Sequence, residues 1–156
     1  MKESKKETNL IFNVNDIGKA RKKLTQANNS VDGVEANHIV AFLTPKERIN
    51  FFNELYRVMK KDSKCQVVTP NWSSNRAYAD LRMQYPPVSE GWFFNLDANF
   101  RKQDPNGDKR YRCDFASTWG YSLHPLLQAR NQEYQQHAIT FWKESAQDII
   151  ATLVKK

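Results

Sequence analysis

The sequence predicts an α/β fold, in which helices connect the strands of an open sheet. Strand-like and helical segments alternate along most of the 156 residues. Residues 31–69 read as a strand, a helix and a second strand, the size that a right-handed crossover between parallel neighbours requires. Strands near 111–121 and 147–154 are expected to form an antiparallel pair at one side of the sheet.

The composition describes one small globular domain and excludes several classes of protein. Hydrophobic residues make up 40% of the chain and aromatic residues 12%, which is enough for one dense core. No apolar run reaches the roughly 18 residues of a membrane-spanning helix, and the charged first residues lead into no secretory signal. Two cysteines, Cys65 and Cys113, are too few for a disulfide scaffold, so a cytoplasmic location is expected.

The first thirty residues predict a tail, a strand and a basic helix. Residues 1–8 are expected to form a basic flexible tail, and residues 9–156 a single domain. Residues 9–14 have the composition of a short strand. Asp16 is suited to cap a basic helix that runs to about Ala27.

Residues 31–69 contain the best-defined elements. An alternating pattern predicts a strand at 31–38, and an apolar strand at 64–69 is stopped by Pro70. Between them, Thr44 can cap a helix in which Glu47 completes a reciprocal capping box. The apolar residues of this helix form one stripe, which is expected to face the core.

The second half is less regular but also predicts helices. Ser73 or Ser74 can cap a helix through about Met83, and Ser89 can cap another with aromatic residues on one face. From Pro125 onward, apolar residues at helical spacing predict one long amphipathic helix. Its stripe consists of Tyr134, His137, Ala138, Phe141 and Trp142.

Several segments together resemble the middle of class I S-adenosylmethionine-dependent methyltransferases. They are Ser30–Ile39, Thr44–Glu47, Glu54–Lys60 and the strand that ends at Pro70. The resemblance covers roughly residues 28–156, and its last part is similar to a phage or marine bacterial branch. It implies a three-layer, shortened Rossmann-like methyltransferase sheet, mostly parallel with an antiparallel C-terminal strand pair.

The resemblance fails where members of the family hold their cofactor. They use a glycine-rich turn after the first strand, but Gly18 is the only glycine before Gly33. Asp16 is the only candidate for the carboxylate that binds the ribose, and its other interpretation is a helix cap. Ala20 stands where the aspartate that faces the adenine is expected. The resemblance therefore implies a degenerate, non-catalytic binding or regulatory module, and no tightly bound cofactor is expected.

An alternative is an active methyltransferase, or another enzyme that uses S-adenosylmethionine, which completes its site through a partner chain. In that case the residues to expect as catalytic base and substrate-positioning group are His38 and Asn71, after two adjacent strands. The expected cofactor-binding residues are then Asp16, Val34, Glu35 and Asn37.

An exposed sheet edge predicts a homodimer. If the family's early strands are absent, the strand at 31–38 loses its usual neighbour, and an unpaired edge beside a buried parallel strand is unfavourable. Either residues 9–14 cover this edge or a second copy of the chain does. No membrane partner is expected.

Nucleic acid and metal ions are lesser alternatives. Residues 19–23 form a basic cluster that can attract polyanions, but no aromatic residue interleaves it as stacking on bases requires. His38, His124 and His137 lie far apart in the sequence, with no cysteine or carboxylate at a ligand spacing. Neither nucleic acid nor a metal ion is therefore expected.

Three sets of side chains have two interpretations each. Trp72 can stack on a planar ligand or cover the sheet edge. Tyr85–Pro87, with Trp92 and Phe93, can line a substrate pocket or pack in the core. Cys65, in the middle of a strand, is expected to be a core thiol rather than a nucleophile.

Overall fold

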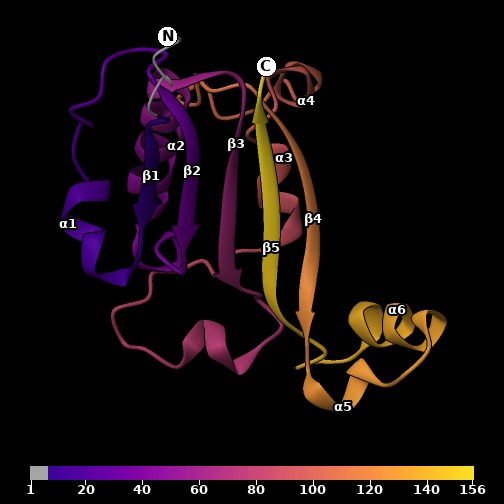
Figure 1. Cartoon of the computed structure of the whole chain (residues 1–156). Helices are drawn as coiled ribbons and strands as arrows, with labels where there is room; N and C mark the ends of the chain where they lie inside the picture. The colour runs from indigo at the N-terminus through magenta and orange to yellow at the C-terminus, as the bar shows by residue number, and fades with distance from the viewer. Residues whose placement is uncertain (1–6) are drawn as a thin grey trace, which may run out of the picture.

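A mixed five-stranded sheet organises the molecule, and helices α2 and α3 lie behind it in Figure 1. The computed structural model describes residues 7–156. The strands are β1 (Asn9–Phe12), β2 (Val31–Asn37), β3 (Met59–Pro70), β4 (Phe115–Leu123) and β5 (Ala146–Lys155). Their order across the sheet is β1-β2-β3-β5-β4. Of these strands, β5 runs antiparallel to both of its neighbours, and the others share one direction.

Both strand pairings predicted from the sequence are confirmed. β2 and β3 are parallel neighbours, with Val34 opposite Cys65, and helix α2 (Pro45–Val58) makes the crossover between them. β4 and β5 are antiparallel, with Thr118 opposite Thr152. The fold class is therefore α/β, with a mostly parallel sheet and an antiparallel C-terminal strand pair.

β1 occupies the place beside β2. Phe12 lies opposite Ala36 in parallel register, so residues 9–14 cover the edge that the sequence analysis left open. Thr8 extends the pairing, because its amide donates to Asp32 Oδ2 at 2.9 Å and its carbonyl accepts from the Asp32 amide at 2.8 Å. Of the predicted tail, residues 1–6 lie outside the described residues.

Helix α2 begins at the capping box that the sequence predicts. Thr44 Oγ1 accepts a hydrogen bond from the Glu47 amide at 3.3 Å, and the Glu47 carboxylate accepts one from the Thr44 amide at 2.8 Å. The apolar stripe packs against the sheet, with Phe51, Phe52 and Leu55 at most 1% exposed. Local sequence and tertiary packing therefore favour the same helix.

The basic helix predicted to reach Ala27 is wrong beyond its first turn, because α1 spans only Ile17–Ala20. The ion pair between Glu54 and Arg57 on α2 forms hydrogen bonds with the backbone of the residues after α1. The Glu54 carboxylate accepts from the Leu24 amide at 2.9 Å, and Arg57 donates to the Leu24 carbonyl at 2.9 Å. These long-range hydrogen bonds replace the ones that a longer helix would form.

The described chain forms two layers, and the third predicted layer is not seen among residues 7–156. α2 and α3 (Glu90–Phe94) contribute to one core cluster with the inward side chains of all five strands. Because β1, β2 and β3 follow one another in one direction across the sheet, right-handed connections place both crossovers on the same face. The opposite face carries no helix in Figure 1.

The predicted helices of the second half are shorter than expected. The helices and turns found there are η3 (Asn75–Tyr78), α3, α4 (Ala98–Gln103), α5 (Pro125–Gln128) and α6 (Gln132–Phe141). Polar side chains cap the N-termini of two of these helices. Asp97 accepts from the Asn99 and Phe100 amides to begin α4, and Asn131 accepts from the Tyr134 amide to begin α6. No helix in the described part of the chain is long and apolar enough to cross a membrane.

A buried arginine fastens the loop before α3 to α2. Arg48 is 2% exposed, and its guanidinium donates to the carbonyls of Val40, in η2 (Val40–Phe42), Gln84 and Pro86 at 3.0, 3.1 and 2.7 Å. Burial lowers the pKa of Arg48 to about 10. Since no carboxylate in the described chain pairs with Arg48, backbone carbonyls alone compensate this charge.

Candidate binding site at the carboxyl edge of the sheet

The carboxyl ends of β1, β2 and β3 meet at one edge of the sheet, where open α/β sheets bind their ligands. Four of the residues predicted as functional lie at this edge. Asp16 follows β1, Asn37 ends β2, His38 follows β2, and Asn71 follows β3. The topology thus places these four residues at one edge of the sheet. The contacts of their side chains determine whether they can bind a ligand there.

Two of the predicted cofactor-binding residues lie elsewhere. Val34 and Glu35 are in the middle of β2 and point to opposite faces of the sheet. Val34 is 4% exposed and belongs to the core, whereas Glu35 is exposed on the uncovered face. The structure does not bring these two side chains to the edge.

Asp16 closes a turn directly after β1. Its carboxylate accepts from the Asn13 amide at 2.9 Å, while the Asn13 side chain accepts from the Asn15 amide at 2.9 Å and caps η1 (Val14–Asp16). Asp16 is therefore the third residue of a capping box led by Asn13. The prediction that it caps the following helix is wrong, because it makes no side-chain cap bond to α1. A Cβ at Gly18 would meet nothing within 4 Å, so no close backbone approach requires this glycine.

His38 has a left-handed backbone conformation, with φ of 58°. This conformation is unfavourable for a residue with a side chain and is found where surrounding structure enforces it. The His38 amide donates to the Val68 carbonyl at 2.7 Å, so β3 enforces it here. The imidazole is half-buried and forms no hydrogen bond with the described residues. It is therefore available to a ligand at the edge.

Asn71 is a structural residue in this arrangement. It is 1% exposed, its Nδ2 donates to Glu90 Oε1 at 3.0 Å, and its Oδ1 accepts from the Ser73 amide at 2.8 Å. Its own amide donates to the Gln147 carbonyl at 3.0 Å. The side chain joins the turn after β3 to the start of α3, and both of its polar atoms are occupied.

Glu90, which the sequence analysis did not single out, contacts polar groups from two segments, the turn after β3 and strand β4. Besides Asn71, it accepts a hydrogen bond from Trp72 Nε1 at 3.2 Å and one from the Tyr121 hydroxyl. Burial, and then the hydrogen bond and negative charge of Glu90, raise the pKa of Tyr121 to about 12. The signal in the sequence was a carboxylate in the first turn of a predicted helix, directly after Ser89.

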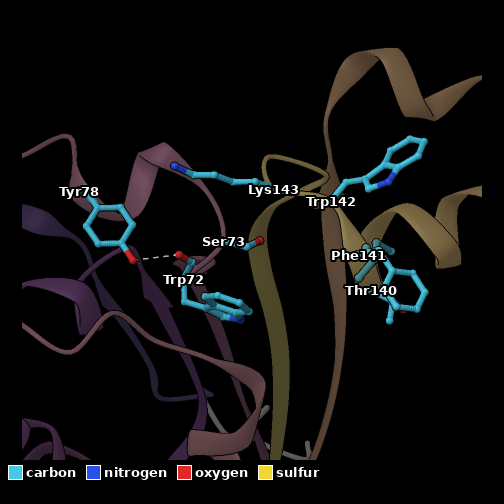
Figure 2. A pocket seen from close by; sticks show the side chains of 8 residues that line it. Trp72, Ser73, Tyr78, Thr140, Phe141, Trp142 and Lys143 are labelled. Carbon is cyan, nitrogen blue, oxygen red and sulfur yellow. Dashed lines mark hydrogen bonds between the residues drawn. The ribbon is translucent and has the colours of Figure 1, made fainter.

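A pocket opens beside this network, between the turn after β3 and the end of α6 (Figure 2). Its lining consists of Trp72, Ser73, Tyr78, Ile139, Thr140, Phe141, Trp142 and Lys143. The Tyr78 hydroxyl donates to the Trp72 carbonyl at 3.1 Å, and the bond to Glu90 orients the Trp72 indole. Trp72 is 51% exposed, so its ring is open to a ligand and does not cover the sheet edge.

The sequence predicts one long amphipathic helix here, and the apolar stripe of α6 faces outward rather than toward the core. Within that stripe only Ala138 is buried, and Phe141 is 70% exposed. The rings pack on one another, with Tyr134 and His137 lying 5.5 and 5.7 Å from Trp142 between centroids. Since α5 and α6 project beyond the ends of β4 and β5 in Figure 1, the sheet offers this stripe no surface to pack on.

The pocket is suited to bind a flat ring rather than to move a proton. The exposed Trp72 indole can stack on a planar group, and Lys143 can pair with an anionic substituent. Its lining contains no histidine, cysteine or carboxylate, the groups that most often transfer protons near neutral pH. Of the other aromatic residues with two interpretations, Trp92 and Phe93 pack in the core, and Tyr85 is 84% exposed.

The described residues hold no group of three histidine, cysteine, aspartate or glutamate side chains that could bind a metal ion. Both cysteines are buried in the core, as expected for Cys65. Burial raises the pKa of Cys65 to about 12, and it is the largest cause that raises the pKa of Cys113 to about 11. The thiolate, which is the reactive form, is therefore scarce near neutral pH.

Ellman's reagent at pH 8 is expected to label neither thiol in the folded protein and both thiols in urea. The pKa values of Cys65 and Cys113 in the folded chain lie above the ordinary value of 9.0. The stability that these neutral buried thiols contribute is thus complete at pH 8, and it falls as the pH rises through 9 towards 12. Rapid labelling of either cysteine without urea contradicts this expectation.

The fold matches solved structures of methyltransferases. An S-adenosylmethionine-dependent methyltransferase from Archaeoglobus fulgidus has a TM-score of 0.58 at 17% identity, over 90% of this chain and 64% of that one. A possible histamine N-methyltransferase from Thermotoga maritima has a TM-score of 0.56 at 12% identity, over 99% and 84%. The YcgJ protein of Bacillus subtilis has a TM-score of 0.51 at 10% identity, over 88% and 68%.

These similarities show the fold alone. The chain has a class I S-adenosylmethionine-dependent methyltransferase-like fold, as the sequence resemblance predicts. It spans 64% of the length of the Archaeoglobus protein. No protein-family model matches the chain, and no curated protein matches it.

Proposed function

We propose that this methyltransferase-like chain is a degenerate, non-catalytic binding or regulatory module that holds no cofactor tightly. The main observation that supports this proposal is the direct connection from β1 to β2. By the resemblance, β2 corresponds to the family's fourth strand, and β1, which precedes the segments that carry the resemblance, lies beside it. Residues 13–30, all of them described, join the two strands with η1 and the four-residue helix α1 and add no further strand. The family's ribose and adenine contacts come from this stretch and have no counterpart here.

The local structure of the connection supports the same proposal. The turn after β1 is a capping box in which Asn13 and Asp16 satisfy each other, so the Asp16 carboxylate is already in use. Ala20, at the position expected to face the adenine, is 2% exposed and belongs to the core cluster. A cofactor bound after β1 would have to displace these contacts.

The pocket of Figure 2 supports a binding role. It lies beside the end of β3 and against α6, and β1 contributes nothing to it. Two of its aromatic residues, Trp72 and Tyr78, are held in place by hydrogen bonds, which reduces the entropy lost when a ligand binds. A preformed pocket whose lining holds no histidine, cysteine or carboxylate suits recognition better than catalysis.

Isothermal titration with S-adenosylmethionine, and in parallel with S-adenosylhomocysteine, is expected to show no binding tighter than about millimolar, or −4 kcal/mol. Losing one charge-assisted hydrogen bond costs on the order of 1.5–3 kcal/mol. The absence of two or three such contacts therefore moves a micromolar site to millimolar affinity or weaker. An active methyltransferase titrated under the same conditions provides the positive control.

A dissociation constant in the low micromolar range would refute the proposal and favour an active enzyme. One observation favours that second candidate, namely the strained backbone of His38 and its imidazole without a partner in the described chain. His38→Ala and Asp16→Ala, in the same titration, then identify the residues that contact the cofactor. If a partner chain completes the site, the affinity is expected to fall on dilution.

The cellular location and the binding of nucleic acid are two further points of the proposal. We place the protein in the cytoplasm, because two unpaired buried thiols fit a reducing compartment. Electrostatic binding of nucleic acid by residues 19–23 is the lesser alternative. Arg21 already pairs with Glu47 at 2.9 Å, and Lys19 lies over the Phe12 ring, so part of this cluster is engaged within the chain.

A further inference from the structure

The face of the sheet opposite the helices is a regular grid of side chains. The strand registers define three rows across it. The first row is Asn9, Gly33, Lys64, Val154 and Ala116; the second is Ile11, Glu35, Gln66, Thr152 and Thr118; the third is Asn37, Val68, Ile150 and Gly120. We call these fourteen residues the open face.

No residue of the open face is buried, and Ile11 is 58% exposed. Most of the residues between them along the strands are core residues; Val67 and Ala151, for example, are 0% exposed. In Figure 1 no helix or loop crosses in front of the strands. Within the described chain, nothing therefore covers this face.

The composition of the open face differs from that of a solvated sheet. An antiparallel sheet with one wet face normally alternates apolar and polar residues. Here one acidic residue, Glu35, and one basic residue, Lys64, are the only charged groups among the fourteen. Seven of the other twelve are glycine, alanine or aliphatic, and the remaining five are uncharged polar residues. An exposed surface of this kind marks an interaction site.

We infer that the open face binds the open face of a second copy of this chain, related to the first by a twofold axis. Gly33 lies opposite Lys64 and Glu35 opposite Gln66, so Glu35 and Lys64 are diagonal neighbours on adjacent strands. A twofold axis that lies in the plane between the two faces, midway between Glu35 and Lys64, sets Glu35 of each copy against Lys64 of the partner subunit, and the pair occurs twice. The face is neutral in a chain of net charge +7, so here two copies approach with the least repulsion.

The dimensions of the face predict how tight the dimer is. Five strands about 4.8 Å apart, and three rows about 6.6 Å apart, give roughly 500 Å² in projection once the width of the side chains is included. Two such faces bury about 1,000 Å², which is the lower limit for a specific interface. We therefore expect a dissociation constant in the micromolar range, so that dimer and monomer exchange on dilution.

Sedimentation equilibrium of the full chain, from about 1 to 200 μM, tests the inference. A reversible dimer is expected, and Ile150→Glu, which places a charge between Val68 and Gly120 in the third row of the face, is expected to weaken it at least tenfold. Thr118→Arg makes the same test at a position whose side chain is exposed and does not belong to the core. Leu81→Glu, at a fully exposed loop residue, is the matched control and leaves the dimer unchanged. Circular dichroism confirms that each variant is folded.

Charge reversal tests the predicted pairing itself. Glu35→Lys alone and Lys64→Glu alone are each expected to weaken the dimer about tenfold, and the double variant is expected to restore it. A chain that is monomeric at 200 μM overturns the inference. So does a dimer that is insensitive to Ile150→Glu and Thr118→Arg, or a double reversal that restores nothing. None of these outcomes depends on S-adenosylmethionine, so they are independent of the proposed function.

Discussion

Replacing Phe52 with alanine is expected to lower the free energy of unfolding by about 4 kcal/mol. Phe52 is 0% exposed, and its ring contacts those of Phe51 and Trp92 edge-to-face, with centroids 5.4 and 5.2 Å away. It lies where α2 meets α3, so truncation leaves a cavity that neither helix can close alone. The free energy of unfolding of small domains is about 5–15 kcal/mol, so this one change removes much of the total stability.

Urea denaturation followed by tryptophan fluorescence measures this loss. Phe141→Ala removes the same ring from a position that is 70% exposed, and it is expected to change the free energy of unfolding by less than about 0.5 kcal/mol. Equal losses in the two variants would show that Phe52 is not part of a close-packed core.

Arg48→Met is expected to lower the free energy of unfolding by about 3 kcal/mol. Methionine fills a similar volume but cannot donate, so the carbonyls of Val40, Gln84 and Pro86 lose their shared partner. The pKa of Arg48, lowered by burial, shows that holding this charge is itself unfavourable. The loss is therefore smaller than three independent hydrogen bonds would suggest, because removal of the charge offsets part of it.

Two further variants isolate the role of the guanidinium. Arg48→Lys keeps the charge but not the planar array of donors, so an intermediate loss is expected. Arg82→Met removes an exposed arginine that pairs with Asp80 only two residues away, and its denaturation midpoint is expected to stay unchanged. If Arg48→Met were as stable as the parent chain, the 84–86 loop would not depend on this anchor.

The elements that sequence analysis predicted well are those whose determinants are local. Thr44, Pro45 and Glu47 determine the start of α2. Thr44 and Glu47 form the predicted capping box, and Pro45 occupies the first turn. The parallel pair of β2 and β3 follows from the length of the crossover and from two apolar strands. Here propensity, patterning and topology all point to the same answer.

The elements that sequence analysis predicted wrongly depend on partners that are distant in the sequence. Residues 21–27 have helical character, but Glu54 and Arg57, some thirty positions later, bind the backbone of this segment instead. The stripe of α6 has genuine helical periodicity, yet periodicity does not reveal what the stripe packs against. In this fold α6 lies beyond the sheet, and its rings pack on each other.

The candidate site shows the same division. The resemblance directed attention to residues at strand ends, and His38 and Asn71 do lie at one edge of the sheet. The role of Asn71 could not be predicted, because it depends on Glu90, nineteen residues further along the chain. The pocket wall formed by α6 is equally remote from Trp72 in sequence. Only the tertiary structure brings the two walls together.

The position of β5 constrains the order in which the sheet can assemble. β5 is the last of the described strands in the chain, yet it lies between β3 and β4 and pairs with both. Until residues 146–155 are available, β4 has no neighbour in the sheet and β3 has an open edge. The contacts that close the sheet span long loops, whose entropy is lost before pairing compensates for it. A ribosome must therefore release nearly the whole of this chain before its sheet can be completed.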